Sequence, residues 1–151
     1  MPLDHLQHVL IQTTDLEGTK DWWVDFLGLE VGPHPDFRVP VYWLYLNGRD
    51  VLHITTGGSG VSENRKRYLG QESDATYGSG VLDHIAFHAT GLVAMMAHLD
   101  AKGIDYKRRQ ITDQNLFQLF LTDPNGVKVE LNYPAEEAAG IEAEITAADL
   151  D

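Results

Sequence analysis

The sequence predicts an α+β fold made of two copies of one module, each a strand, a helix and three further strands. The segment LQHVLIQTTDL (6–16) aligns with LDHIAFHATGL (82–92) at a constant offset of 76 residues. Both segments alternate apolar and non-apolar side chains, as a strand with one packed face does. A chain of 151 residues is long enough for two small halves that share a core.

A helix is predicted after each of these first strands. The two helical stretches are EGTKDWWVDFLGL (17–29) and VAMMAHLDAKGI (93–104). Each reaches a glycine, Gly28 or Gly103, where a left-handed residue is expected to close the helix. The chain then becomes extended again in LEVG (29–32) and IDYKRR (104–109).

The last two strands of each half are predicted from a strand–turn–strand pattern. WLYLNGRDVLHIT (43–55) parallels QLFLTDPNGVKVELN (118–132). In the second copy, DPNG (123–126) is a strong hairpin signal, because proline fixes φ and Asn-Gly adopts turn conformations. In this alignment His53 falls on Glu130.

The domain organisation follows from this repeat. The modules are predicted to span 3–56 and 81–134. The connection 57–80 is rich in glycine and serine and too long for an ordinary loop, so it is expected to be a functional lid or a mobile loop. Its basic run 65–67 is expected to be solvated or to receive an anionic substrate tail. The acidic tail 135–151 is expected to be a solvated helix or a disordered end.

Composition excludes several classes of protein. The formal net charge is −12, so a nucleic-acid partner is not expected. The absence of cysteine excludes disulfides, thiolate metal sites and a cysteine nucleophile, and leaves only nitrogen and oxygen ligands for a metal. No signal peptide and no apolar run long enough to span a membrane are recognised, so a cytoplasmic protein is expected.

Four polar side chains are predicted to share one face of the strands. On each strand an apolar pair brackets a position that points the other way, and these positions hold His8, His53, His84 and Glu130. If the halves pair by pseudo-twofold symmetry, the four converge in one cup. Three histidines and a carboxylate suit one divalent ion such as Fe(II), Mn(II), Ni(II), Co(II) or Zn(II), and two histidines with one glutamate suit the facial triad of non-haem iron oxygenases.

The same alternation predicts which side chains line the cup. Trp43, Tyr45, Gln118 and Phe120 point towards the metal side. The aromatic rings suit a flat small-molecule substrate, or they only fill the cup. His88 lies on the face of His84 and is either a further substrate contact or a solvated strand end.

The sequence resembles the vicinal oxygen chelate superfamily, which includes glyoxalase I, extradiol dioxygenases, methylmalonyl-CoA epimerase, fosfomycin-resistance transferases and bleomycin-resistance proteins. The resemblance rests on LQHVLIQTTDLEGTKDWWVDFLGLEV, LDHIAFHATGL and especially DPNGVKVELNY. It implies two βαβββ modules in a partly closed, eight-stranded sheet around a metal, and a homodimer. The ligand positions it implies are His8, His53, His84 and Glu130. Members share Lewis-acid chemistry on vicinal oxygens of a substrate.

The resemblance leaves the reaction open. Glyoxalase I usually has glutamate at the position of His53 and arginine at the position of Gln12. The epimerase typically has glutamine at the position of His53. Extradiol dioxygenases bind Fe(II) through two histidines and a glutamate, and many place a histidine at the position of His53 as acid/base. Their tyrosine falls on Phe120 here, with Tyr45 as the pseudo-symmetric alternative.

We therefore expect a dioxygenase-like enzyme, with Fe(II) as the favoured metal and His53 as acid/base or fourth ligand. A glyoxalase-like lyase or an epimerase is the alternative within enzymes. A non-catalytic binding protein of the bleomycin-resistance type is the alternative outside them.

Overall fold

The computed structural model describes residues 3–69, 75–112 and 114–146. The chain divides into two compact units, Met1–Gly78 and Ser79–Asp151. The modules predicted over 3–56 and 81–134 each fall within one unit. No helix in the described residues is long and apolar enough to cross a membrane.

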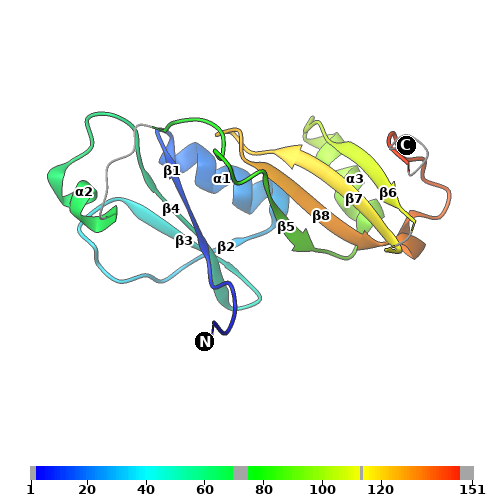
Figure 1. The fold of residues 1–151 in the computed structure, drawn as a ribbon, viewed down its shortest axis with the longest axis horizontal. Coiled ribbons are helices and arrows are strands. Elements are labelled where there is room, and N and C mark those ends of the chain that lie inside the picture. Colours follow the sequence, from blue (N-terminus) through cyan, green and yellow to red (C-terminus); the bar gives the residue numbers. More distant parts are fainter. Residues whose placement is uncertain (1–2, 70–74, 113, 147–151) are drawn as a thin grey trace. The chain divides into compact units, whose positions relative to one another are not determined.

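The first unit contains one four-stranded sheet in the order β1-β4-β3-β2. Strands β1 and β4 are parallel, and the other neighbours are antiparallel. Helix α1 packs against β3 and β4 (Figure 1). The elements are β1 (Val9–Thr13), α1 (Leu16–Leu27), β2 (Glu30–Gly32), β3 (Val41–Leu46), β4 (Arg49–Thr56) and α2 (Glu63–Leu69).

The second unit repeats this topology with the order β5-β8-β7-β6, again with a parallel pair (β5 and β8) and antiparallel neighbours. Its elements are β5 (His84–His88), α3 (Leu92–Ala101), β6 (Lys107–Ile111), β7 (Leu116–Thr122), β8 (Lys128–Pro134) and a 3₁₀ turn, η1 (Ala135–Ala138). The predicted α+β class and the two βαβββ modules are confirmed, as two four-stranded sheets.

Both helices end where the sequence predicts. Gly28 has φ of 74° and closes α1, and Gly103 has φ of 67° just after α3. Their amino ends differ, however. Asp15 caps α1 by accepting from Gly18 N at 2.9 Å, whereas the equivalent position in the second unit is Gly91.

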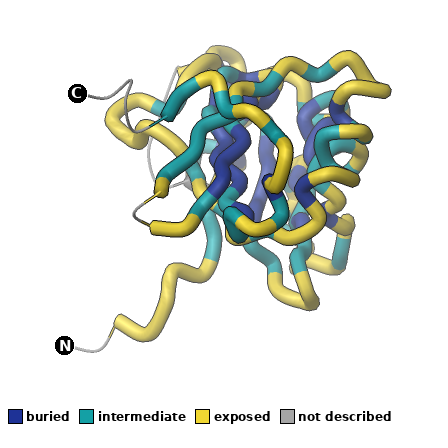
Figure 2. Tube along the Cα trace, turned by 90° about the vertical axis from the view of Figure 1, so that its right-hand side faces the viewer, coloured by how far each residue is buried: buried dark blue, intermediate teal, exposed yellow. Residues whose placement is uncertain are grey.

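Each unit has an apolar core of its own between its sheet and its helix. Most strand positions predicted to face the helices are buried, although Val9, Ile85 and Phe87 are only half-buried. The chain leading to the N-terminus is exposed (Figure 2). The core of the first unit is Ile11, Trp22, Trp23, Leu29, Val41, Leu44, Leu52 and Ile54. That of the second is Leu92, Leu99, Phe117, Leu119, Leu121, Val127, Val129, Leu131, Tyr133 and Ala138.

The connection between the modules differs from the expected loop, because it contains α2. Asn64 on this helix donates through Nδ2 to the carbonyl oxygens of Phe37 and Arg38, at 3.3 and 3.0 Å. Arg65 is only 2% exposed, so the expectation of a solvated basic run is wrong for this residue. The part of the connection at 70–74 lies outside the described residues.

The acidic tail is also more ordered than expected, as far as residue 146. Glu137 on η1 accepts from Gly91 N and Leu92 N at 2.8 and 2.7 Å, and so caps α3. Ile145 forms a parallel bridge with Arg109 on the edge strand β6. The tail over 135–146 therefore packs on the second unit, and residues 147–151 lie outside the described part.

Candidate metal centre

The sheet register makes His53 and Glu130 equivalent. In the parallel pair of the first unit Leu10 lies opposite His53, and in that of the second unit Ala86 lies opposite Glu130. The repeat-based alignment of these two polar residues is therefore confirmed at the level of strand pairing.

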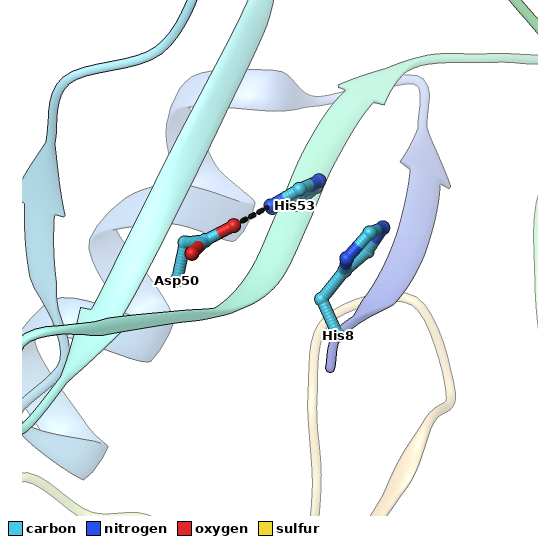
Figure 3. A group of neighbouring side chains, drawn as sticks. All are labelled: His8, Asp50 and His53. Atoms are coloured by element: carbon cyan, nitrogen blue, oxygen red, sulfur yellow. Dashed lines mark hydrogen bonds and ion pairs between the residues drawn. The ribbon is translucent and has the colours of Figure 1, made fainter. Parts of the chain in front are cut away.

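In the first unit, His8 and His53 are brought together with a carboxylate, Asp50 (Figure 3). The imidazole rings of the two histidines stack with centroids 3.8 Å apart and an interplanar angle of 20°. His53 Nε2 lies 2.8 Å from Asp50 Oδ2. One ligand atom from each of the three residues lies within 4.8 Å of the others, close enough for one metal ion.

Asp50 was missed by the sequence reasoning, because strict alternation places it on the helix side with Leu52. A β-bulge breaks that alternation. Leu44 pairs with Leu52, but the next residue, Tyr45, pairs with Asp50, so Val51 is the extra residue. A bulge redirects the side chains beyond it, and Asp50 lies beside His53 for this reason.

The Asp50 carboxylate determines which nitrogen of His53 is available. An ionised carboxylate can only accept, so His53 Nε2 carries the proton of the neutral ring and Nδ1 keeps the free lone pair. The hydrogen bond to His53 lowers the pKa of Asp50. Burial lowers the pKa of His53, although the hydrogen bond to Asp50 opposes this change. A neutral imidazole is the form that binds a metal or accepts a proton.

Trp43 covers the other side of His53. Their ring centroids are 4.0 Å apart and the rings are nearly parallel, at 4°. The Phe37 ring is tilted against that of Trp43, with centroids 6.0 Å apart. Tyr45 shares the face but donates its hydroxyl to the carbonyl oxygen of Pro33 at 2.6 Å. That hydroxyl therefore donates to the backbone within the first unit.

In the second unit, His84 and Glu130 form a pair. His84 Nε2 lies 3.2 Å from Glu130 Oε2, and Glu130 is only 7% exposed. Gln118 Nε2 and Asn132 Nδ2 donate to the other carboxylate oxygen, Oε1, at 2.9 and 2.8 Å. These two amides fix the carboxylate and leave Oε2 directed at His84. Phe120 approaches the His84 ring edge-on at 6.5 Å.

His8 and His84 are oriented by the residue that precedes each of them. His8 Nδ1 lies 3.1 Å from Gln7 Oε1, and His84 Nδ1 lies 2.7 Å from Asp83 Oδ1. Both oxygens accept, so Nδ1 donates and Nε2 is left with its lone pair. This is the arrangement in which outer hydrogen bonds orient metal-binding histidines. The pKa of Asp83 is lowered by Lys128 and then by His84.

The donor set suits a divalent metal. With Nδ1 as the donor, His84 Nε2 and Glu130 Oε2 are two acceptors 3.2 Å apart, so a cation, either a second ring proton or a metal ion, belongs between them. Imidazole nitrogens with carboxylate oxygens suit the ions named from the sequence. The structure brings the predicted ligands together as two pairs, His8 with His53 and His84 with Glu130, each within its own unit.

The predicted lining residues divide in the same way. Trp43 stacks on His53, and Gln118 and Phe120 contact the pair of the second unit. His88 is exposed at the end of β5, next to Asn132 in the register.

Comparison with known proteins identifies the family of this chain. The sequence profile of the Glyoxalase/Bleomycin resistance protein/Dioxygenase superfamily matches residues 5–131. No curated protein sequence matches significantly.

Solved structures with the same fold are distant in sequence. A lactoylglutathione lyase from Agrobacterium tumefaciens is 15% identical, with a TM-score of 0.64 over 90% of this chain and 98% of that one. The fosfomycin resistance protein FosX from Listeria monocytogenes is 16% identical, with a TM-score of 0.63 over 87% and 94%. TnmS3, an antibiotic binding protein from a Streptomyces species, is 18% identical, with a TM-score of 0.62 over 89% and 98%.

These likenesses establish the fold, and the profile match covers most of the chain. The protein belongs to the Glyoxalase/Bleomycin resistance protein/Dioxygenase superfamily.

Proposed function

We propose that this protein is a metal-dependent enzyme that acts on a small substrate through two adjacent oxygen atoms, in the manner of the dioxygenase branch. His8, His84 and Glu130 are the proposed ligands of one divalent ion, with Fe(II) favoured. His53 is the proposed acid/base or a fourth ligand. His8, His53, His84 and Glu130 are the ligand positions that the resemblance to the vicinal oxygen chelate superfamily implies.

One observation carries the proposal. In the second unit, His84 Nε2 and Glu130 Oε2 lie 3.2 Å apart, and two amides hold the other oxygen of this buried carboxylate. His8, at the equivalent position of the repeat, likewise lies beside a histidine with a carboxylate partner, His53 with Asp50.

Each side chain has a distinct task in this scheme. A bound divalent ion would supply Lewis-acid stabilisation of negative charge that develops on substrate oxygens. His53, neutral and held by Asp50, accepts a proton at Nδ1, and the charge of Asp50 stabilises the protonated ring. Trp43 covers one face of His53, which supports exclusion of water and packing against a flat substrate.

Two alternatives rest on the role of His53. If its Nδ1 binds the metal, the site has four protein ligands and suits a glyoxalase-like lyase or an epimerase. The carboxylate partner of His53 favours this reading, because metal-bound histidines often donate their other nitrogen to a carboxylate. A binding protein without catalysis would need none of the four side chains.

Metal analysis of the purified protein tests the proposal. We expect one divalent ion per site, and loss of that ion from His8→Ala and from Glu130→Ala. The exposed His5 provides a control, and His5→Ala should keep the full metal content. Full metal content in either ligand variant would contradict the site.

His53→Ala separates the reactions. Retained metal with lost oxygen uptake on catechols supports His53 as acid/base of a dioxygenase. Lost metal, together with no oxygen uptake by the parent protein, supports the lyase alternative. A metal-free protein that is stable and inactive after metal loading would support a binding role.

A further inference from the structure

A cluster of cations lies on the Glu130 face of the second sheet. Lys107, Arg109 and Lys128 line a hollow of about 350 Å³, and the Phe120 ring lies among them. This concentration of positive charge stands out in a chain with 23 acidic and 11 basic residues. Each of the three cations also lies near a carboxylate, on Glu144, Glu130 or Asp83, so the way each cation is held decides which one can bind an anionic ligand.

Arg109 differs from the two lysines in how it is held. Lys128 Nζ donates to Asp83 Oδ1 at 2.8 Å, so that its charge is paired. Lys107, whose side chain is 76% exposed, has Nζ 4.0 Å from Glu144 Oε2. Arg109 Nε donates to Gln118 Oε1 at 2.6 Å, and its guanidinium carbon lies 4.6 Å from the centre of the Phe120 ring.

These contacts fix the guanidinium while leaving its outer edge available. Arg109 Nη2 lies 3.9 Å from Glu130 Oε2, which is an ion-pair distance but too long for a hydrogen bond. Among the described residues, neither Nη atom makes a hydrogen bond. The backbone of Arg109 is held as well, because Ile145 of the tail bridges to it at the edge of β6.

The outer edge of the Arg109 guanidinium lies close to the proposed metal ligands of the second unit. Glu130 Oε2, the oxygen near Arg109 Nη2, is also the oxygen that faces His84 Nε2. Gln118 links the two groups, since it accepts from Arg109 and donates to Glu130. A small molecule at the ligands of the second unit therefore comes within reach of the guanidinium.

We propose that Arg109 is a specificity-determining residue that binds a carboxylate group of the substrate. The substrate class is then a small, planar carboxylic acid that also carries two adjacent oxygen functions, such as a carboxylated catechol. The planar guanidinium edge matches a carboxylate in a two-point contact, which an ammonium group does not. Naming this substrate class rests on the proposed function, whereas carboxylate binding by Arg109 does not.

The first test uses benzoate on the full chain without added metal, followed by NMR of the arginine Nε–Hε signals. Benzoate should shift the Arg109 signal with saturation, and benzamide, its neutral analogue, should not. Arg109→Gln should weaken benzoate binding about 10- to 100-fold, the range for hydrogen bonds to a charged group. Arg109→Lys should restore only part of this loss.

Arg108 provides the matched control. It is the neighbouring arginine on β6, with Nε paired to Glu144 Oε1 at 3.3 Å, so Arg108→Gln should bind benzoate like the wild type. Circular dichroism and thermal melting establish that each variant is folded. No shift with benzoate, or equal weakening by Arg108→Gln and Arg109→Gln, overturns the proposal.

The second test compares catechol with 3,4-dihydroxybenzoate on Fe(II)-loaded protein in the absence of oxygen. The carboxylated compound should bind about tenfold or more tightly, and Arg109→Gln should abolish that preference. Equal binding of both compounds by the wild type overturns the substrate class. Benzoate binding without any metal binding would instead contradict the proposed function while leaving Arg109 as a carboxylate site, so the two failures are distinguishable.

Discussion

At the scale of single residues, Asp50 gives the most direct prediction about the site. Asp50→Asn keeps the shape of the side chain but removes the charge that holds His53 Nε2–H. Metal affinity should fall about 10- to 100-fold if His53 is a ligand, which is the usual effect of losing an outer carboxylate partner. Competition with a chelating dye measures this change.

If His53 is instead the acid/base, Asp50→Asn should leave metal affinity unchanged and lower turnover. The control is Glu30→Gln, which neutralises an exposed carboxylate on β2 of the same unit. Unchanged metal affinity together with unchanged turnover in Asp50→Asn would contradict a role for this carboxylate in the site.

Tyr133 gives a prediction about stability against pH. It is fully buried, its hydroxyl has no hydrogen-bond partner among the described residues, and burial raises its pKa to about 12. The folded state therefore resists loss of the proton that the unfolded chain gives up near pH 10. The free energy of unfolding is therefore unaffected by the titration of this group below pH 10 and falls as the pH rises from 10 towards 12.

Tyr133→Phe removes this dependence. At pH 7 the variant should be at least as stable as the wild type, because an unpaired buried hydroxyl is lost. At pH 11 it should gain about a further 1 kcal/mol relative to the wild type. Urea unfolding at both pH values measures the difference, and Tyr77→Phe, at a tyrosine 76% exposed, is the control. An identical loss of stability with pH in Tyr133→Phe and wild type would contradict the explanation.

At the scale of elements, the two helices begin in different ways. Asp15, the residue just before α1, caps that helix with its own side chain. The equivalent residue before α3 is Gly91, which has φ of 82° and no side chain. A non-glycine residue is strained at that φ. The cap of α3 is supplied from η1 by Glu137, 46 residues further along the chain.

Glu137→Ala should therefore destabilise the protein by about 1–2 kcal/mol, because two amide groups at the start of α3 lose their acceptor. For a chain of this size, this corresponds to a fall in Tm of about 2–8 °C. Calorimetry measures it, with Glu136→Ala at the exposed neighbour as the control. Equal Tm values for the two variants would show that the cap contributes nothing.

At the scale of the whole molecule, metal binding should couple to stability. A ligand at 100 times its Kd stabilises the folded state by about 2.7 kcal/mol, so removal of the metal with EDTA should lower Tm by about 5–10 °C. His8 and His84 belong to different units. If both hold the same ion, His8→Ala and His84→Ala should each abolish the response to metal and EDTA.

A thermal shift assay in the presence of metal and then of EDTA measures this response. A full metal-dependent shift in one of these two variants would show that the remaining pair binds the ion by itself. In that case the first unit, with His53 and Asp50 as further ligands, or the second, with Glu130, would be the site.

The sequence by itself determined the module, its repetition and the positions of the proposed ligands. Alternation of apolar residues, helix-closing glycines such as Gly28 and the hairpin signal at 123–126 are local patterns. They predict local conformation because backbone preferences and the direction of side chains depend on near neighbours. The equivalence of His53 and Glu130 follows from the repeat, and the strand registers bear it out.

Only the tertiary structure decided which partners these residues acquire. Asp50 reaches His53 because a bulge opposite β3 interrupts the two-residue period, and no local pattern announces that bulge. Glu137 reaches α3 from a segment 46 residues away, and Arg109 reaches Glu130 through Gln118 across three neighbouring strands. Such contacts depend on sheet register and on how the tail packs, which are properties of the folded chain as a whole.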